Sequence, residues 1–166
     1  MKPTEEKPAK PKVLLVDDEA KICASLAGAL VSEGFEVVFV ESGDEALTAF
    51  RDGIFDIVLM DLGMPGKSCW ETFAQLAWSR PLLPVIIITA LPDQSAAAKA
   101  AGVGALLEMP LEIPLLLETM RRLLAEPIEA RLARVAGKTP LLDPKTMRHF
   151  LAASLKIART ENRLSP

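Results

Sequence analysis

The chain has 166 residues, half of them apolar, and a formal net charge of −3. This length suits one domain with an appendage, and the apolar half excludes a globally disordered chain. The two cysteines, Cys23 and Cys69, lack metal-ligand spacing and indicate reduced thiols of a cytoplasmic protein. We expect no signal peptide and no membrane span, since no apolar run approaches ~20 residues.

Charge is spread unevenly along the chain. Residues 1–126 carry 11 basic and 19 acidic side chains, a balance of −8, whereas residues 127–166 carry 8 and 3, a balance of +5. Residues 1–11 hold three prolines and alternating charges, which is typical of a flexible leader. We therefore predict a leader over 1–11, a globular domain over 12–126 and a basic helical extension over 127–166.

Short apolar runs alternate with helical patterns through the globular domain. The runs predict buried parallel strands over 13–16, 35–40, 54–61, 85–89 and 105–108. Apolar periodicity and capping residues predict helices over 20–32, 42–53, 68–79, 94–101 and 114–125. In the first helix the expected buried stripe is Ile22, Leu26, Ala29 and Leu30. The alternation predicts an α/β fold, a doubly wound five-stranded parallel sheet of flavodoxin-like order 2-1-3-4-5.

The basic extension also has helical patterns. Pro127 interrupts the preceding helix, and apolar periodicity resumes over 128–135. Asp143 and Pro144 then predict the start of a last helix, which runs from Lys145 to about Glu161. The two helices share an apolar face that we expect to pack on the domain or on a second subunit. This face consists of Leu132, Val135, Phe150, Leu151 and Leu155.

Polar side chains follow three of the predicted strands. Asp17 and Asp18 end the first strand, Asp61 ends the third and Thr89 ends the fourth. Because the carboxyl ends of parallel strands lie at one sheet edge, we expect these side chains to converge. Three converging carboxylates need a hard cation to stay ionised together, and oxygen ligands suit Mg²⁺. Such a site suits phosphoryl transfer onto a carboxylate.

The order and spacing of these segments resemble the receiver domain of bacterial two-component response regulators. The resemblance lies in Val13–Glu19, in Asp56–Asp61 followed by Met64–Pro65, and in Ile88–Ala90. It extends over residues 12 to about 126. Each fragment alone would be weak, whereas the combination in this order is specific.

The resemblance implies a role for each matching residue. Asp61 would be the phosphate acceptor, and Asp18 a direct magnesium ligand. Asp17 would assist through a water molecule, and the carbonyl of Gly63 would also bind the metal. Thr89 would hydrogen-bond a phosphoryl oxygen.

The same resemblance implies a signalling function. The chain would be a stand-alone response regulator, not an enzyme, phosphorylated on Asp61 by a sensor histidine kinase or a phosphotransfer protein. Its output would be protein–protein contact. A homodimer could form through the 114–125 helix and the extension.

Three positions depart from the family's pattern. Met109 stands where the family has a lysine before Pro110, Leu106 where it has an aromatic switch residue, and Cys69 where a glycine is usual. Three carboxylates and one Mg²⁺ sum to −1, and a phosphoryl group that replaces the charge on Asp61 brings about −1.5 to −2. The missing lysine therefore supports an alternative, a pseudo-receiver that acts as a phosphorylation-independent interaction module.

The basic extension supports one further alternative, a regulator that contacts DNA through its tail. Against it, the 40 residues of 127–166 are short for the output domains that this family carries. They also show no recognition-helix pattern. Packing or self-association is therefore favoured, and we do not expect DNA to be a partner.

Overall fold

Five strands form one parallel sheet in the order β2-β1-β3-β4-β5, as predicted. The structure is a computed structural model that describes residues 9–64, 69–91 and 93–136. The strands are β1 (Lys12–Val16), β2 (Glu36–Val40), β3 (Ile57–Asp61), β4 (Val85–Thr89) and β5 (Ala105–Glu108). The order reverses between β1 and β3, so a crevice is expected where these two strands end.

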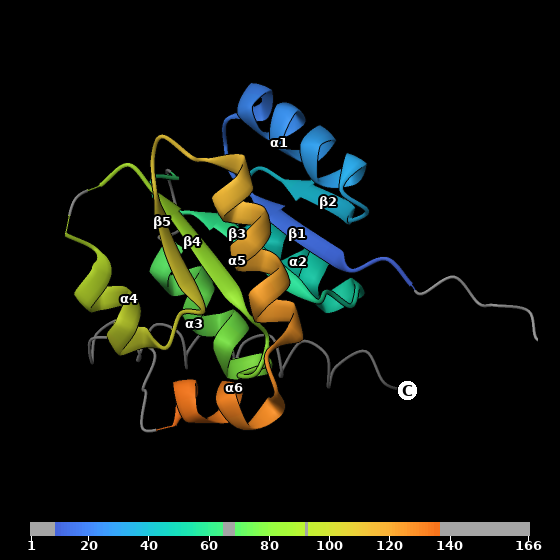
Figure 1. The fold of residues 1–166 in the computed structure, drawn as a ribbon. Coiled ribbons are helices and arrows are strands. Elements are labelled where there is room, and N and C mark those ends of the chain that lie inside the picture. The colour runs from blue at the N-terminus through green and yellow to red at the C-terminus, as the bar shows by residue number, and fades with distance from the viewer. Residues whose placement is uncertain (1–8, 65–68, 92, 137–166) are drawn as a thin grey trace, which may run out of the picture.

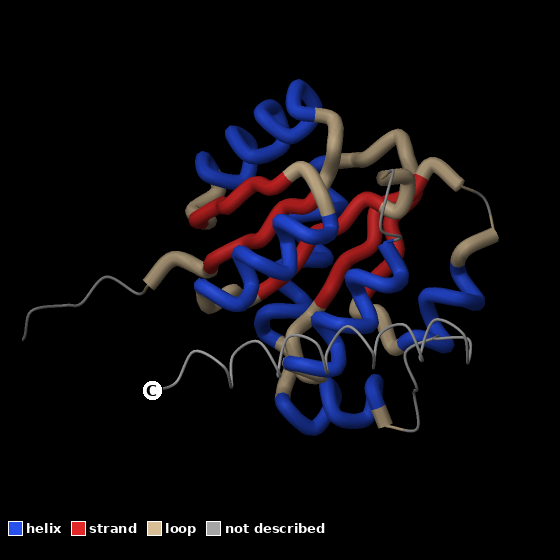
Figure 2. The backbone as a smooth tube through the Cα atoms, turned by 180° about the vertical axis from the view of Figure 1, so that it is seen from behind, coloured by secondary structure: helices blue, strands red, loops and turns tan. Residues whose placement is uncertain are grey.

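Helices cover both faces of the sheet (Figures 1 and 2). They are α1 (Ala20–Ser32), α2 (Gly43–Asp52), α3 (Cys69–Ser79), α4 (Ser95–Ala101), α5 (Ile113–Ala125) and α6 (Ile128–Val135). Helices α1 and α5 pack on one face, while α2, α3 and α4 pack on the other. This is the doubly wound arrangement that alternating strands and helices predict.

The central strands are buried on both faces because helices cover each side. In β1, Val13 and Leu15 belong to the apolar cluster under α1 and α5, whereas Leu14 and Val16 belong to the cluster under α2 and α3. Successive side chains of a strand point to opposite faces, so an unbroken apolar run fills both layers. The sheet edge that carries the strand ends is therefore held by a rigid core.

Two differences from the sequence prediction change which apolar side chains are buried. In α1, Cys23 is fully buried and Ile22 is 42% exposed, so the buried stripe is rotated by one residue. Strand β3 begins at Ile57 instead of Ile54, and Ile54 is 75% exposed. The chain enters this strand through Asp56, whose Oδ2 accepts a 2.7 Å hydrogen bond from the amide of Lys12.

Helix α2 begins at the predicted cap. The Ser42 hydroxyl accepts a 3.1 Å hydrogen bond from the Glu45 amide. The Glu45 carboxylate accepts a 3.0 Å bond from the Glu41 amide, one residue before the cap. The analogous capping box predicted for α3 involves Ser68, which lies outside the described residues.

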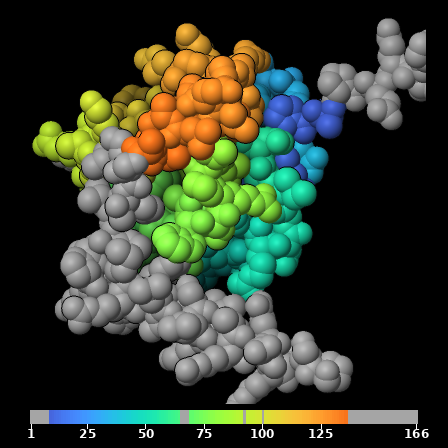
Figure 3. All heavy atoms as spheres, turned by 90° about the horizontal axis from the view of Figure 1, so that it is seen from below, coloured from blue at the N-terminus to red at the C-terminus, as the bar shows by residue number. Residues whose placement is uncertain are grey.

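Helix α6 lies across the end of the domain, beside the end of α5 and near α3 and α4 (Figure 3). Its Arg131 guanidinium donates hydrogen bonds to the backbone carbonyls of Leu123, Leu124 and Glu126. Leu132 is half exposed, so this part of the predicted apolar face is not covered by the described chain. The other predicted helix, over 145–161, lies outside the described residues.

Crossing a bilayer requires a helix that is both long and apolar. None of the helices over residues 9–64, 69–91 and 93–136 meets both requirements.

Candidate functional site

Asp61 is the last residue of β3 and lies at the carboxyl edge of the sheet. Its strand is paired on one side with β1 and on the other with β4, where Asp61 is opposite Ile88. The Leu62 amide continues this ladder with a 2.8 Å bond to the Ile88 carbonyl. The Gly63 amide donates a 3.0 Å hydrogen bond to Asp61 Oδ1. Backbone on both sides therefore fixes the Asp61 carboxylate.

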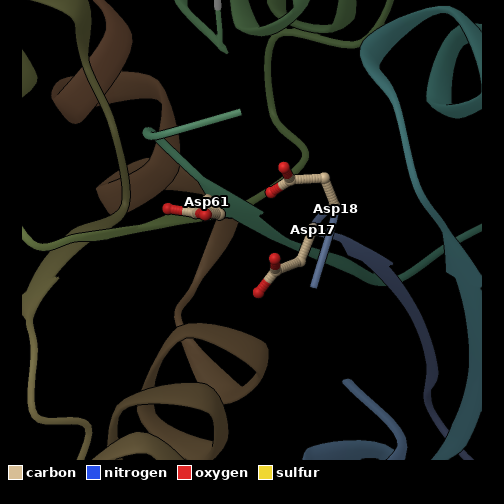
Figure 4. A group of neighbouring side chains, drawn as sticks. All are labelled: Asp17, Asp18 and Asp61. Atoms are coloured by element: carbon tan, nitrogen blue, oxygen red, sulfur yellow. The ribbon is translucent and has the colours of Figure 1, made fainter. Parts of the chain in front are cut away.

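Asp17 and Asp18 lie in the short loop between β1 and α1. The Asp17 amide bonds the Val40 carbonyl at 3.1 Å, and Asp17 Oδ1 accepts a 2.9 Å bond from the Glu19 amide. Asp18 is exposed. Figure 4 shows both side chains next to Asp61, where β1 and β3 end. One carboxylate oxygen from each of the three residues lies within 4.8 Å of the others.

Burial and neighbouring charge both act on Asp61. Burial, and to a smaller extent the Asp17 and Asp18 carboxylates, raise the pKa of Asp61, while the hydrogen bond from Gly63 opposes them. The same carboxylates also act on the pKa values of two buried thiols. Burial and then Asp17 raise the pKa of Cys23 to about 12, and burial and then Asp61 raise the pKa of Cys69 to about 12. The edge therefore has an excess of negative charge that a cation would relieve.

The donor set fits a hard divalent cation. All three side chains offer carboxylate oxygens, which Mg²⁺ prefers, and the exposure of Asp18 leaves room for the water that this ion keeps. Asp17, Asp18 and Asp61 would hold such an ion. Gly63 lies two residues beyond Asp61 and is exposed. That its carbonyl also binds the metal stays a prediction.

A cavity of about 530 Å³ opens beside Asp61 and was not anticipated from the sequence. The carboxylates of Asp17, Glu19 and Asp61 line one part of it, and the remaining walls come from α1, the end of β4, the β5–α5 loop and the start of α5. Met109, at the position where the family has a lysine, is among the lining residues and is 42% exposed. The space beside the carboxylates is therefore bordered by a thioether at the position where the family has a cation.

Thr89 is fully buried at the end of β4. Its hydroxyl oxygen accepts a 2.9 Å hydrogen bond from the Leu91 amide. Thr89 is not among the described residues that line the cavity. The structure thus brings Asp17, Asp18 and Asp61 together and holds the Thr89 hydroxyl in the turn that follows β4.

The two other departures from the family pattern lie in the packed layers. Leu106 of β5 is half-buried against the apolar cluster under α2, α3 and α4. Cys69, the first residue of α3, is buried in that same cluster, and its thiol is free. Both side chains therefore contribute to packing.

The fold, the strand-end carboxylates and the comparisons with known proteins agree on a class. The chain belongs to the response regulator receiver domain family, whose model matches residues 13–110. It is the receiver domain of a two-component response regulator.

The curated relatives are regulators of transcription. The transcriptional regulatory protein ZraR of Salmonella typhimurium is 34% identical over 115 residues, which are 68% of this chain and 26% of that protein. The DNA-binding transcriptional regulator NtrC of Klebsiella pneumoniae is 38% identical over 96 residues, which are 58% of this chain and 20% of that protein. The chain thus spans about a quarter of the length of these relatives. Because these relatives are regulators of transcription, they do not support the expectation that DNA is not a partner.

Solved structures show the same fold. The chemotaxis response regulator CheY4 of Vibrio cholerae has a TM-score of 0.64 at 27% identity, covering 69% of this chain and 98% of its own. The response regulator TrrA of Thermotoga maritima, in complex with Mg²⁺ and beryllofluoride, has a TM-score of 0.64 at 28% identity, covering 68% and 98%.

Proposed function

We propose that the chain accepts a phosphoryl group on Asp61 from a sensor histidine kinase or a phosphotransfer protein, with Mg²⁺ bound by Asp17, Asp18, Asp61 and the Gly63 carbonyl. One observation carries the proposal. Three carboxylates from two neighbouring strand ends converge within 4.8 Å, at the point where the strand order reverses.

In the proposed reaction a carboxylate oxygen of Asp61 attacks the phosphorus of a phosphohistidine. A P–O bond forms, the P–N bond breaks, and the histidine nitrogen leaves with its electron pair. The backbone of β3 and the Gly63 amide orient the nucleophile, so positioning provides much of the rate. The bound metal would neutralise charge on the transferring group.

The proposal also gives Thr89 a role, as a hydrogen-bond donor to the phosphoryl group. Its hydroxyl oxygen accepts a hydrogen bond from the Leu91 amide. To hydrogen-bond a phosphoryl oxygen, Thr89 would turn its hydroxyl away from Leu91 and toward Asp61. The exchange would couple phosphorylation to the turn after β4, which is a local rearrangement of the kind that switches use.

Asp61 is the acceptor and not a residue that turns over substrate, so we do not propose an enzyme. The complex of TrrA with Mg²⁺ and beryllofluoride, in a chain 28% identical to this one, supports the metal and the anion. Two free, buried cysteines agree with a reducing compartment, and we place the protein in the cytoplasm.

The test is incubation with acetyl phosphate and Mg²⁺, followed by intact-mass measurement and peptide mapping. The wild type should gain one phosphoryl group on Asp61, which chelator should prevent. Asp61→Asn should gain none, while Asp56→Asn, which changes a carboxylate at the other end of β3, should behave as the wild type. A wild type indistinguishable from Asp61→Asn would remove the proposal.

A second candidate is the pseudo-receiver, an interaction module that phosphorylation does not switch. The observation that favours it is Met109, which borders the Asp61 cavity in place of a cation. In this case the oligomeric state and the partner contacts would be the same with and without an adduct on Asp61.

A third candidate is a DNA-contacting regulator, which the names of the relatives favour. The contact would be made through the basic residues of 127–166 and would depend strongly on salt. Binding of the full chain to a mixed duplex at low salt should then weaken on Lys145→Glu with Arg148→Glu. Equal binding by this variant would rule the tail contact out.

A further inference from the structure

The proposed phosphoryl site has an unbalanced charge. Three carboxylates meet at the sheet edge, and a phosphoryl group on Asp61 would replace the single negative charge of that residue by about −1.5 to −2. A divalent cation offsets only part of this. Met109 borders the adjoining cavity with a neutral side chain, so any further positive charge must come from another wall.

Lys21 is the only cationic side chain among the described residues that line this cavity. Asp17 and Asp61 line the same space. Lys21 is the second residue of α1, and Ser25, one turn later on the same helix face, also lines the cavity. The face of α1 that carries Lys21 is therefore turned toward the carboxylates.

Helix stability does not account for a lysine at this position. The first turn of a helix favours acidic side chains because the helix dipole is positive there. α1 has the acidic Glu19 at its N-cap, but its first turn has no acidic residue and carries Lys21. No ion pair joins Lys21 to another residue within the part of the chain that the structure describes. Its exposed ammonium group is thus available to an anion in the cavity.

We propose that Lys21 is a positioning and charge-balancing residue of the phosphoryl site, and that it replaces from α1 the cation that Met109 does not provide after β5. The inference rests on the proposed phosphorylation of Asp61. The flexible four-carbon stem of Lys21 places its ammonium group against the phosphoryl oxygens when Asp61 is modified, and the group remains in solvent otherwise.

The test uses the full chain, with beryllofluoride and Mg²⁺ as probes, and measures the binding of each by isothermal titration calorimetry. Lys21→Gln should weaken beryllofluoride binding by about tenfold, which is the scale of one hydrogen bond to a charged group. It should not weaken Mg²⁺ binding measured without beryllofluoride, because a positive charge near the metal is removed. Lys99→Gln, an exposed lysine of α4, is the matched control for net charge and should behave as the wild type.

Two rescue variants separate charge from structure. Lys21→Arg should keep most of the beryllofluoride affinity, and Met109→Lys should restore it in the Lys21→Gln background. Equal beryllofluoride affinity in Lys21→Gln and Lys99→Gln would overturn the inference. So would a joint loss of Mg²⁺ and beryllofluoride binding that neither rescue repairs. A wild type that binds no beryllofluoride and forms no adduct on Asp61 would instead overturn the proposed function, and Lys21 with it.

Discussion

The backbone amide of Met109 donates a 2.8 Å hydrogen bond to the carbonyl oxygen of Thr89. Because Glu108 is already paired with Thr89 in the β4–β5 ladder, this bond extends the pairing by one residue. The backbone at position 109 is thus fixed at the end of the sheet, and its side chain borders the cavity beside Asp61. Any side chain at this position will border the same cavity.

The first prediction follows from this geometry. Met109→Lys should tighten the binding of beryllofluoride in the presence of Mg²⁺ by about tenfold, or ~1.4 kcal/mol, because a cation then borders the anion. Calorimetry on the wild type and the variant measures the change. Leu115→Lys, which adds the same charge at an exposed position of α5, should leave the affinity unchanged. An unchanged affinity in Met109→Lys would mean that position 109 does not act on the site.

The same variant distinguishes a receiver that switches from a pseudo-receiver. Sedimentation of the wild type with and without beryllofluoride reports whether the adduct changes the oligomeric state. If only Met109→Lys responds to the anion, the native chain lacks the switch. A response in the wild type would exclude the pseudo-receiver, and it would also test the predicted homodimer through α5 and the extension.

The second prediction concerns the stability of the metal-free site. Because burial and nearby carboxylates raise the pKa of Asp61, ionised Asp61 disfavours the folded state. In chelator, stability should therefore fall as pH rises from the ordinary carboxyl pKa through the raised pKa of the folded state. Asp61→Asn should lose this slope and be more stable than the wild type at neutral pH.

Thermal unfolding from about pH 4 to about pH 8, with chelator and with Mg²⁺, provides the measurement. Mg²⁺ should stabilise the wild type more than Asp61→Asn, since a ligand that binds only the folded state adds stability. In chelator, the stability of the wild type minus that of Asp61→Asn should be greater in acid than at neutral pH. The opposite order would contradict the predicted sign.

The third prediction concerns the contact between α2 and α3. A Cβ built on Gly43 would lie 2.2 Å from Oγ1 of Thr72, a buried hydroxyl that has no hydrogen-bond partner among the described residues. Gly43→Ala should therefore destabilise the protein by ~1–3 kcal/mol in urea unfolding, as overpacking does. In a Thr72→Ala background the same change should cost much less. Additive effects of the two substitutions would show that the side chains do not meet.

The fourth prediction concerns Arg131, which bonds three backbone carbonyls at the end of α5. The last carbonyls of a helix lack the usual amide partners four residues on, although the Leu123 carbonyl also accepts a 3.3 Å bond from the Glu126 amide. A cation there also complements the helix dipole. Arg131→Met should lower the free energy of unfolding by ~1 kcal/mol, because water replaces part of what is lost. Amides of α6 should exchange faster in hydrogen-exchange measurements. Arg122→Met removes an exposed cation from the last turn of α5 and so controls for the dipole. It should cost less than Arg131→Met and leave exchange of the α6 amides unchanged.

Much of the fold follows from the sequence because its strands are unbroken apolar runs. Val13–Val16 and Val85–Ile88 cannot be helical stripes, and runs buried on both faces indicate a parallel sheet. The start of β3 is harder to predict, since Ile54 is apolar like the strand that follows but lies outside the ladder. The predicted buried side of α1 is wrong by one residue because Ile22 and Cys23 both complete a helical stripe with Leu26.

The acidic part of the site could also be predicted, whereas its surroundings could not. Strand order alone brings Asp17, Asp18 and Asp61 to one edge. The cavity depends on how α1 and the β5–α5 loop pack, which no local pattern encodes, so the sequence alone assigns Lys21 no role. The signal that was present is its place three residues after Asp18, in the first turn of the predicted helix.

The central claim is that Asp61 accepts a phosphoryl group beside a metal held by its acidic neighbours. The most direct measurement is a crystal structure of the full chain grown with Mg²⁺ and beryllofluoride. We expect a metal ion bound by Asp61 and Asp18, with beryllofluoride attached to an Asp61 oxygen. Beryllofluoride and Mg²⁺ both absent from this edge, at concentrations that saturate receivers of this family, would contradict it.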